Sequence, residues 1–178
     1  MDKENKLPLW DELPTFEIYL DQLLDLANNY VYPITGEHLT RTMMHNYTKA
    51  EVIVRPRNKR YLKIHLAGAI VVSLLKSVFS LDTIKNGFQI EMEQDSAQEA
   101  YDRFVNMFNQ VSKTSDSEYS GSENPNSQAA MIQYQAILSV TYHLRAIATM
   151  RKILLQTLTT PISDVKKQKN TSSESFQN

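Results

Sequence analysis

The segment of residues 39–49 has the spacing of a short amphipathic helix. Side chains three or four positions apart share one face of a helix. One face is apolar and suited to packing on a core, and it consists of Leu39, Met43, Met44 and Tyr47. The opposite face carries hydrogen-bond donors, which are Arg41, Thr42, His45, Asn46 and Lys49. Such donors are the groups that contact phosphates and base edges in nucleic acids.

Positive charge is concentrated in the same region. Residues 41–63 contain seven basic residues and one acid, Glu51, which gives +6 in a chain of formal charge −1. Such segregation indicates a polyanion-binding face, although a charged segment is also commonly just a solvated loop. The basic residues are Arg41, Lys49, Arg55, Arg57, Lys59, Arg60 and Lys63.

The overall composition favours a mostly helical, cytoplasmic protein. There is no cysteine, which excludes disulfides, thiolate zinc sites and cysteine nucleophiles. The first residues lack the apolar stretch of a signal peptide, and the longest apolar run, residues 66–75, is too short to span a bilayer. Only four glycines occur, and long segments have helical periodicity.

The N-terminal half of the chain predicts a compact order of elements. After an irregular leader over 1–13, we expect a helix over 15–29 capped by Thr15, with Phe16, Leu20, Leu23 and Ala27 on one stripe. Pro33 should break it, and Thr35 should cap the next helix, about 37–49. Residues 52–54 and 60–62 should pair as a small hairpin, or wing, around Pro56. A buried helix over 64–79 and a short helix from Ser80 to about Gly87 should follow.

The C-terminal half predicts two further helices. An amphipathic helix covers 95–112, a mobile polar loop covers 112–127, and the longest helix covers 128–159. A disordered tail should follow from about residue 161. The longest helix has more apolar surface than one packing face can use, which predicts a dimer interface, unless the 95–112 helix covers it. The interface would consist of Ile137, Val140, Leu144, Ile147, Leu154 and Leu158.

The predicted order of elements is a helix, a turn, a polar helix, a basic hairpin and a buried helix. This is the layout of a winged helix-turn-helix DNA-binding domain. Three strings resemble the MerR-type DNA-binding domain: Thr42-Met-Met-His-Asn-Tyr47, Val52-Ile-Val-Arg-Pro56 with Arg60-Tyr61, and Val78-Phe-Ser-Leu-Asp-Thr-Ile84. Residues 39–49 are more similar still to a bacterial family catalogued as domain of unknown function 1836. The resemblance covers roughly residues 8–90. One departure is Leu62, which stands where the family often has a Ser or Thr helix cap.

The resemblance implies an all-α fold with a small β-wing. A MerR-like winged helix-turn-helix domain over 14–90 would precede a helical dimerisation or effector region over 91–160. The implied function is sequence-specific transcriptional regulation, with the helix at about 37–49 in the major groove and the wing at 55–61 on phosphates. Its partners would be double-stranded DNA, a second copy of the chain and an unidentified small-molecule effector. The implied DNA-binding residues are Arg41, Thr42, His45, Asn46, Tyr47, Lys49, Arg55, Arg57, Lys59, Arg60 and Tyr61.

An enzyme is the weaker interpretation. The sequence has no Gly-rich phosphate loop, no Gly-x-Ser-x-Gly elbow and no His-Glu-x-x-His string, and its four histidines lack metal-ligand spacing. We therefore expect no catalytic residue, metal or cofactor. The alternative from a different class is a helical protein–protein interaction module whose basic patch binds an acidic partner.

Overall fold

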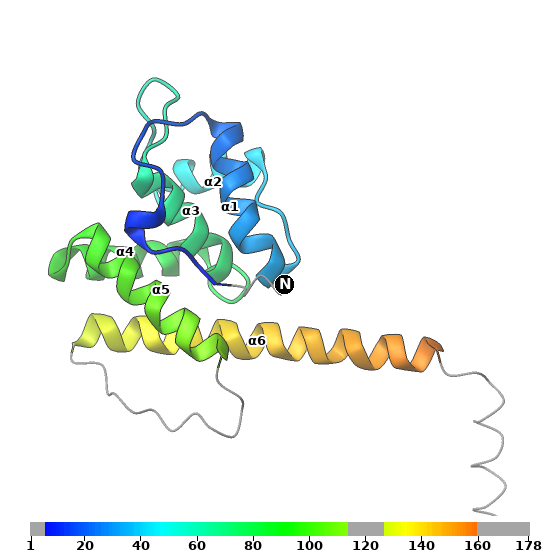
Figure 1. Cartoon of the computed structure of the whole chain (residues 1–178). Coiled ribbons are helices and arrows are strands. Elements are labelled where there is room, and N and C mark those ends of the chain that lie inside the picture. The colour runs from blue at the N-terminus through cyan, green and yellow to red at the C-terminus, as the bar shows by residue number, and fades with distance from the viewer. Residues whose placement is uncertain (1–5, 114–126, 160–178) are drawn as a thin grey trace, which may run out of the picture. The chain divides into compact units, whose positions relative to one another are not determined.

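The computed structural model describes residues 6–113 and 127–159, and Figure 1 shows its element order. The 3-10 helix η1 (Trp10–Glu12) is followed by α1 (Leu20–Thr35), α2 (Arg41–Lys49) and α3 (Lys63–Leu75). Next come α4 (Leu81–Gln94), α5 (Ala97–Lys113) and α6 (Gln128–Thr159). No strand occurs in the described ranges, so the fold is helical as predicted. The chain divides into one compact unit up to Leu144 and a second from Arg145 onward.

The core of the first unit is built around α3. Nearly every residue of α3 is buried, and it packs against α1 and α4. Gly68 lies beside the segment after α2, since a Cβ at this position would contact the Ile53 side chain at 3.4 Å, an ordinary van der Waals distance. The prediction of an all-round buried helix is therefore confirmed, although the helix ends at Leu75 and not at residue 79.

Helix α1 begins and ends later than predicted. It starts at Leu20, so Thr15 is not its cap, and Phe16 is 67% exposed. Leu23 and Ala27 are buried as expected. Pro33 lies inside the last turn and does not end the helix, although its nitrogen cannot donate a backbone hydrogen bond. The helix ends at Gly36, whose φ of 72° suits a glycine and whose N–H donates to the carbonyl of Tyr32.

Helix α2 is shorter than predicted, and a different threonine caps it. The Thr40 side chain accepts a hydrogen bond from the backbone N–H of Met43, whereas Thr35 is the last residue of α1. The Asn28 amide exchanges two hydrogen bonds with the backbone of Leu39, at 2.7 and 3.0 Å. These bonds fix the turn between α1 and the start of α2.

The predicted two-stranded hairpin does not form in the described chain. Tyr61 instead forms an isolated bridge with Ile18, with both backbone N···O distances 2.9 Å. A tight turn is present, but its central residues are Asn58 and Lys59, both with left-handed φ. The Arg60 N–H donates to the carbonyl of Arg57 across it. Positive φ at both central positions is the feature of type I′ hairpin turns, so only the tip of a hairpin exists.

The remaining helices follow the sequence more closely. Ser80 caps α4 by accepting from the N–H of Thr83, as predicted, but α4 continues past Gly87 to Gln94. Ser96 and Glu99 form a reciprocal capping box at the start of α5. Helix α6 has the predicted bounds. Most of the loop predicted for 112–127 lies outside the described residues. The whole of the tail predicted from 161 also lies outside them.

The N-terminal leader belongs to the core. Leu7 and Leu13 are buried, and the Asn109 amide of α5 exchanges two hydrogen bonds with the backbone of Leu7. The backbone N–H of Trp10 donates to Asp102. Among the described residues, no helix has the length and hydrophobicity needed to cross a bilayer.

Candidate nucleic-acid interface

Helix α2 presents the face that its sequence predicts. Met44 and Tyr47 are buried and Met43 packs against the core, so this side anchors the helix. The opposite side is solvent-exposed along the whole helix. Its side chains are Arg41, Thr42, His45, Asn46 and Lys49.

The loop that follows carries the second group of exposed cations. We call residues 55–61 the basic loop. Arg55, Arg57 and Lys59 are exposed, and none of them has an ion-pair partner among the described residues. The tight turn at Asn58 and Lys59 keeps these side chains at its tip. Their positive charge is therefore available to an anionic partner.

The start of α2 and the end of the basic loop both lie next to the start of α1. Arg41 forms an ion pair with Asp21 in the first turn of α1. The Arg60 guanidinium lies 3.9 Å from the ring centroid of Tyr19, the N-cap residue of α1. These contacts hold the exposed face of α2 and the basic loop in one surface. The candidate DNA-binding surface consists of Arg41, Thr42, His45, Asn46, Lys49, Arg55, Arg57, Lys59 and Arg60.

The free positive charge is smaller than the sequence count indicates. Two of the seven basic residues have an acid partner. Arg41 pairs with Asp21, and the mostly buried Lys63 has its Nζ atom 3.9 Å from a carboxylate oxygen of Asp11 in the leader. The only acid of the segment, Glu51, pairs with Lys85 of α4 at 2.9 Å, which lowers the pKa of the Glu51 carboxyl. Four cations remain exposed without an acid partner in the described residues, namely Lys49, Arg55, Arg57 and Lys59.

Tyr47 and Tyr61 belong to the core and not to the candidate DNA-binding surface, which corrects their predicted role. Their exposed fractions are 3% and 5%. Burial raises the pKa of Tyr47 to about 12, an effect that the Ser73 hydroxyl partly offsets. Burial also raises the pKa of Tyr61, against the influence of Arg41. Both rings therefore pack in the core beneath the candidate DNA-binding surface and are not exposed to solvent.

His65 performs a role that the sequence interpretation missed. The backbone N–H of Leu62, the N-cap residue of α3, donates to His65 Nδ1 at 2.8 Å, so His65 takes the place that Glu or Gln has in a capping box. The ring is buried and lies edge-on to Tyr61. Because Leu62 directly follows the basic loop, this bond fixes the loop's C-terminal end. A histidine three residues after the N-cap is the sequence signal for such a cap.

Comparison with known families identifies the family of this chain. The model of the family described as domain of unknown function (DUF1836) matches residues 8–119. The chain belongs to this family. The match extends past the 8–90 span of the resemblance and includes all of α4 and α5. No curated protein and no solved structure matches the chain. Among the described residues of this DUF1836 member, no cluster of His, Asp or Glu could hold a metal ion.

Proposed function

We propose that this DUF1836 protein is a DNA-binding transcriptional regulator that reads sequence with α2 and holds phosphates with the basic loop. The observation that carries the proposal is the separation of the two faces of α2. One face is anchored in the core, and the other offers an amide, an imidazole, a hydroxyl and two cations to solvent. A helix of this kind, held against a preceding helix by a short turn, suits the major groove.

Roles within the candidate DNA-binding surface follow from side-chain chemistry. Asn46 would pair with the N6 and N7 atoms of adenine, and Arg41 with guanine O6 and N7 after leaving Asp21. Thr42 and His45 would contact base edges or adjacent phosphates. Lys49, Arg55, Arg57, Lys59 and Arg60 would contact the backbone, so that the basic loop acts as a reduced wing.

A homodimer would fit this function, because two copies of α2 could then reach two half-sites about one helical turn apart. In the described part of α6, Ile137 and Val140 are buried in the first unit's own core, and Leu144 packs against that core. These three residues of the predicted interface are thus covered by the chain's own core and are not available to a second copy. We place the interface on the later positions, Leu154 and Leu158, together with the half-buried Ile147.

Selection of DNA from a random pool, followed by fluorescence titration, tests the proposal. We expect an enriched motif and binding that weakens steeply with salt. Release of counterions by the four free cations gives a slope of log K against log salt of about −4 per subunit. Asn46→Ala should cost on the order of 1–3 kcal/mol on the selected site and relax preference at one base pair.

The loop variant Arg57→Ala/Lys59→Ala should weaken every sequence about equally and reduce the salt slope by about 2. Its matched control is Lys6→Ala/Lys113→Ala, which removes the same charge from exposed positions outside the candidate DNA-binding surface and outside α6 and should leave binding unchanged. No enriched motif, together with capture of an acidic protein partner through the same residues, would favour the interaction module instead.

A further inference from the structure

A large cavity lies within the first unit, and none of the residues of the candidate DNA-binding surface lines it. Its volume is about 640 Å³, and its walls come from α3, α4, α5, the start of α6 and residues 51–54. Volumes of this order hold drug-sized ligands. The walls are mostly aliphatic and aromatic side chains. Four of them, Val54, Ile64, Met92 and Ile132, remain 39–56% exposed, so the cavity is open to solvent.

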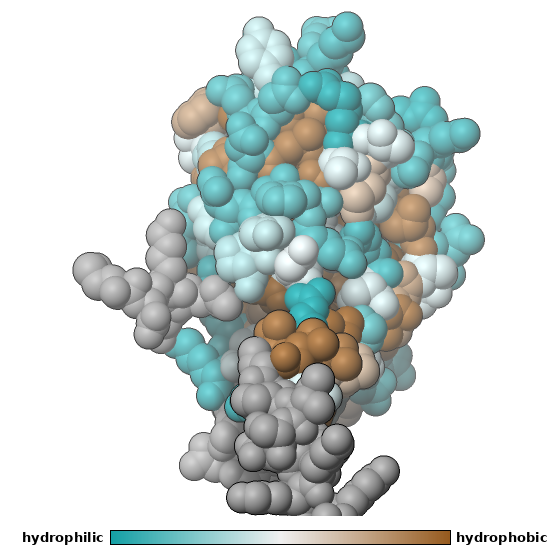
Figure 2. Space-filling model, turned by 90° about the vertical axis from the view of Figure 1, so that its right-hand side faces the viewer, coloured by the Kyte–Doolittle hydropathy of each residue, from teal (hydrophilic) through white to brown (hydrophobic). Residues whose placement is uncertain are grey.

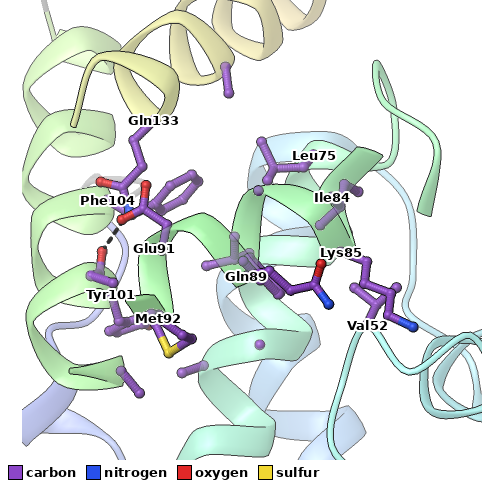
Figure 3. A pocket seen from close by; sticks show the side chains of 18 of the residues that line it. Val52, Leu75, Ile84, Lys85, Gln89, Glu91, Met92, Tyr101, Phe104 and Gln133 are labelled. Carbon is purple, nitrogen blue, oxygen red and sulfur yellow. Dashed lines mark hydrogen bonds between the residues drawn. The ribbon is translucent and has the colours of Figure 1, made fainter. Parts of the chain in front are cut away.

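One buried carboxylate interrupts the apolar wall. Glu91 of α4 lines the cavity and is only 4% exposed. One of its oxygens, Oε2, accepts from the Arg103 guanidinium, whereas Oε1 is buried without any hydrogen-bond partner. Figure 3 shows Glu91, Gln133 and Phe104 together on one side of the cavity, opposite Leu75, Ile84 and Lys85. A buried acceptor without a partner is costly, since it loses water and gains nothing in return.

No group around Glu91 donates to Oε1 among the described residues. The Arg103 guanidinium is already shared with Asp95 at 2.8 Å and with the side-chain oxygen of Gln133 at 2.9 Å. The Gln133 amide nitrogen donates to the carbonyl of Ala100. Two carboxylates, Glu91 and Asp95, therefore share one guanidinium, so the cluster that includes Glu91 carries a net negative charge. A hydrogen-bond donor with positive charge complements it, whereas an anion would be repelled.

We propose that the cavity binds a lipophilic amine, with its apolar body against the walls from α3 and α4 and its ammonium group donating to Glu91 Oε1. This site is independent of the proposed DNA binding, and it gives a definite chemical class to the small-molecule effector. It also includes Ile53, which packs beside Gly68 in the segment that joins α2 to the basic loop. A bound amine would thus contact the segment that positions the candidate DNA-binding surface.

Three fluorescent probes with one ring system test the site in the full chain. They are 9-(aminomethyl)anthracene, 9-anthracenemethanol and 9-anthracenecarboxylate, followed by fluorescence titration and calorimetry. We expect saturable one-to-one binding of the amine, at least tenfold tighter than that of the alcohol, and the weakest binding for the carboxylate. Equal affinities for the three probes, or the absence of saturable binding, would overturn the proposal without the need for any variant.

Two variants then locate the bound amine. Glu91→Gln should remove the tenfold advantage of the amine over the alcohol. Its control, Glu93→Gln, makes the same charge change at an exposed position of α4 and should retain the advantage. Gly87→Leu should abolish binding of all three probes, because Gly87 lines the cavity and a Cβ there meets no atom within 4 Å. If Glu91→Gln does not fold, the Gly87→Leu result decides, and undiminished amine binding there would contradict the site.

Discussion

A single hydrogen bond, from the Leu62 N–H to His65 Nδ1, links the end of the basic loop to the first turn of α3. It requires an unprotonated Nδ1, so the neutral ring carries its proton on Nε2. Burial lowers the pKa of His65 below its ordinary value, and the hydrogen bond from the Leu62 N–H favours the same neutral ring. The folded protein therefore binds this proton less readily than the unfolded chain does.

The free energy of unfolding should consequently decrease as pH falls below about 6.5, the ordinary pKa of histidine, toward the lower folded value. Urea titrations between pH 7.5 and 5 measure this. His65→Gln is the matched variant, because a glutamine oxygen can accept from the N-cap N–H but does not titrate. We expect it to flatten the decrease in this pH range. An unchanged pH profile in His65→Gln would mean that another group causes the decrease.

Residues of α2 could be assigned to their faces from the sequence because helical spacing alone decides the faces of an anchored helix. The tyrosines could not. Tyr47 and Tyr61 each combine an apolar ring with a polar hydroxyl, so spacing does not say whether they are core or contact. Arg41 and Lys63 looked equally free in the sequence. Their partners, Asp21 and Asp11, are distant along the chain and become neighbours only in the fold.

The position of α2 depends on the two hydrogen bonds between the Asn28 amide and the backbone of Leu39. Asn28→Ala removes both and leaves two partly buried backbone groups without partners. We expect a loss of about 1–3 kcal/mol in the free energy of unfolding. DNA affinity should also fall, although Asn28 lies outside the candidate DNA-binding surface.

The neighbouring Asn29 provides the control. It is exposed in the same helix, so Asn29→Ala should leave stability equal or slightly higher, because alanine has the better helix propensity. Chemical denaturation and DNA titration of the two variants measure both effects. Equal stability of the two variants would contradict the role of Asn28 in holding the turn.

Helix bounds were less predictable than helix existence, and the reasons are visible in the structure. Pro33 and Gly87 were expected to end helices, but α1 continues two residues past Pro33 to Thr35, and tertiary packing outweighs the weak helix propensity of one glycine in α4. The hairpin was predicted from β-prone residues 52–54. Val52 and Ile53 are instead buried against the helical core, and Tyr61 pairs with Ile18. Strand pairing depends on such long-range partners, which local sequence does not reveal.

At the scale of the whole molecule, α6 combines two different apolar surfaces. Ile137 and Val140 are 0% and 1% exposed, in the core of the first unit. In the second unit, Leu154 and Leu158 are 62% and 81% exposed, and Met150 and Ile153 are also exposed. Figure 2 shows hydrophobic side chains at the surface among hydrophilic ones. Apolar side chains grouped in this way usually mark an interface, whereas single exposed ones are ordinary.

This division makes the dimer proposal testable with three variants. Leu154→Glu/Leu158→Glu should give a folded monomer by light scattering at micromolar concentration, since both side chains lie outside the core. Thr149→Glu/Gln156→Glu adds the same charge about half a helical turn away from this stripe and should remain dimeric. Val140→Glu should unfold the first unit, because it places a charge in the core.

On the selected DNA, the monomeric variant Leu154→Glu/Leu158→Glu should occupy one half-site with reduced affinity. A monomeric wild-type chain would refute the dimer, and a dimeric Leu154→Glu/Leu158→Glu variant would place its interface elsewhere.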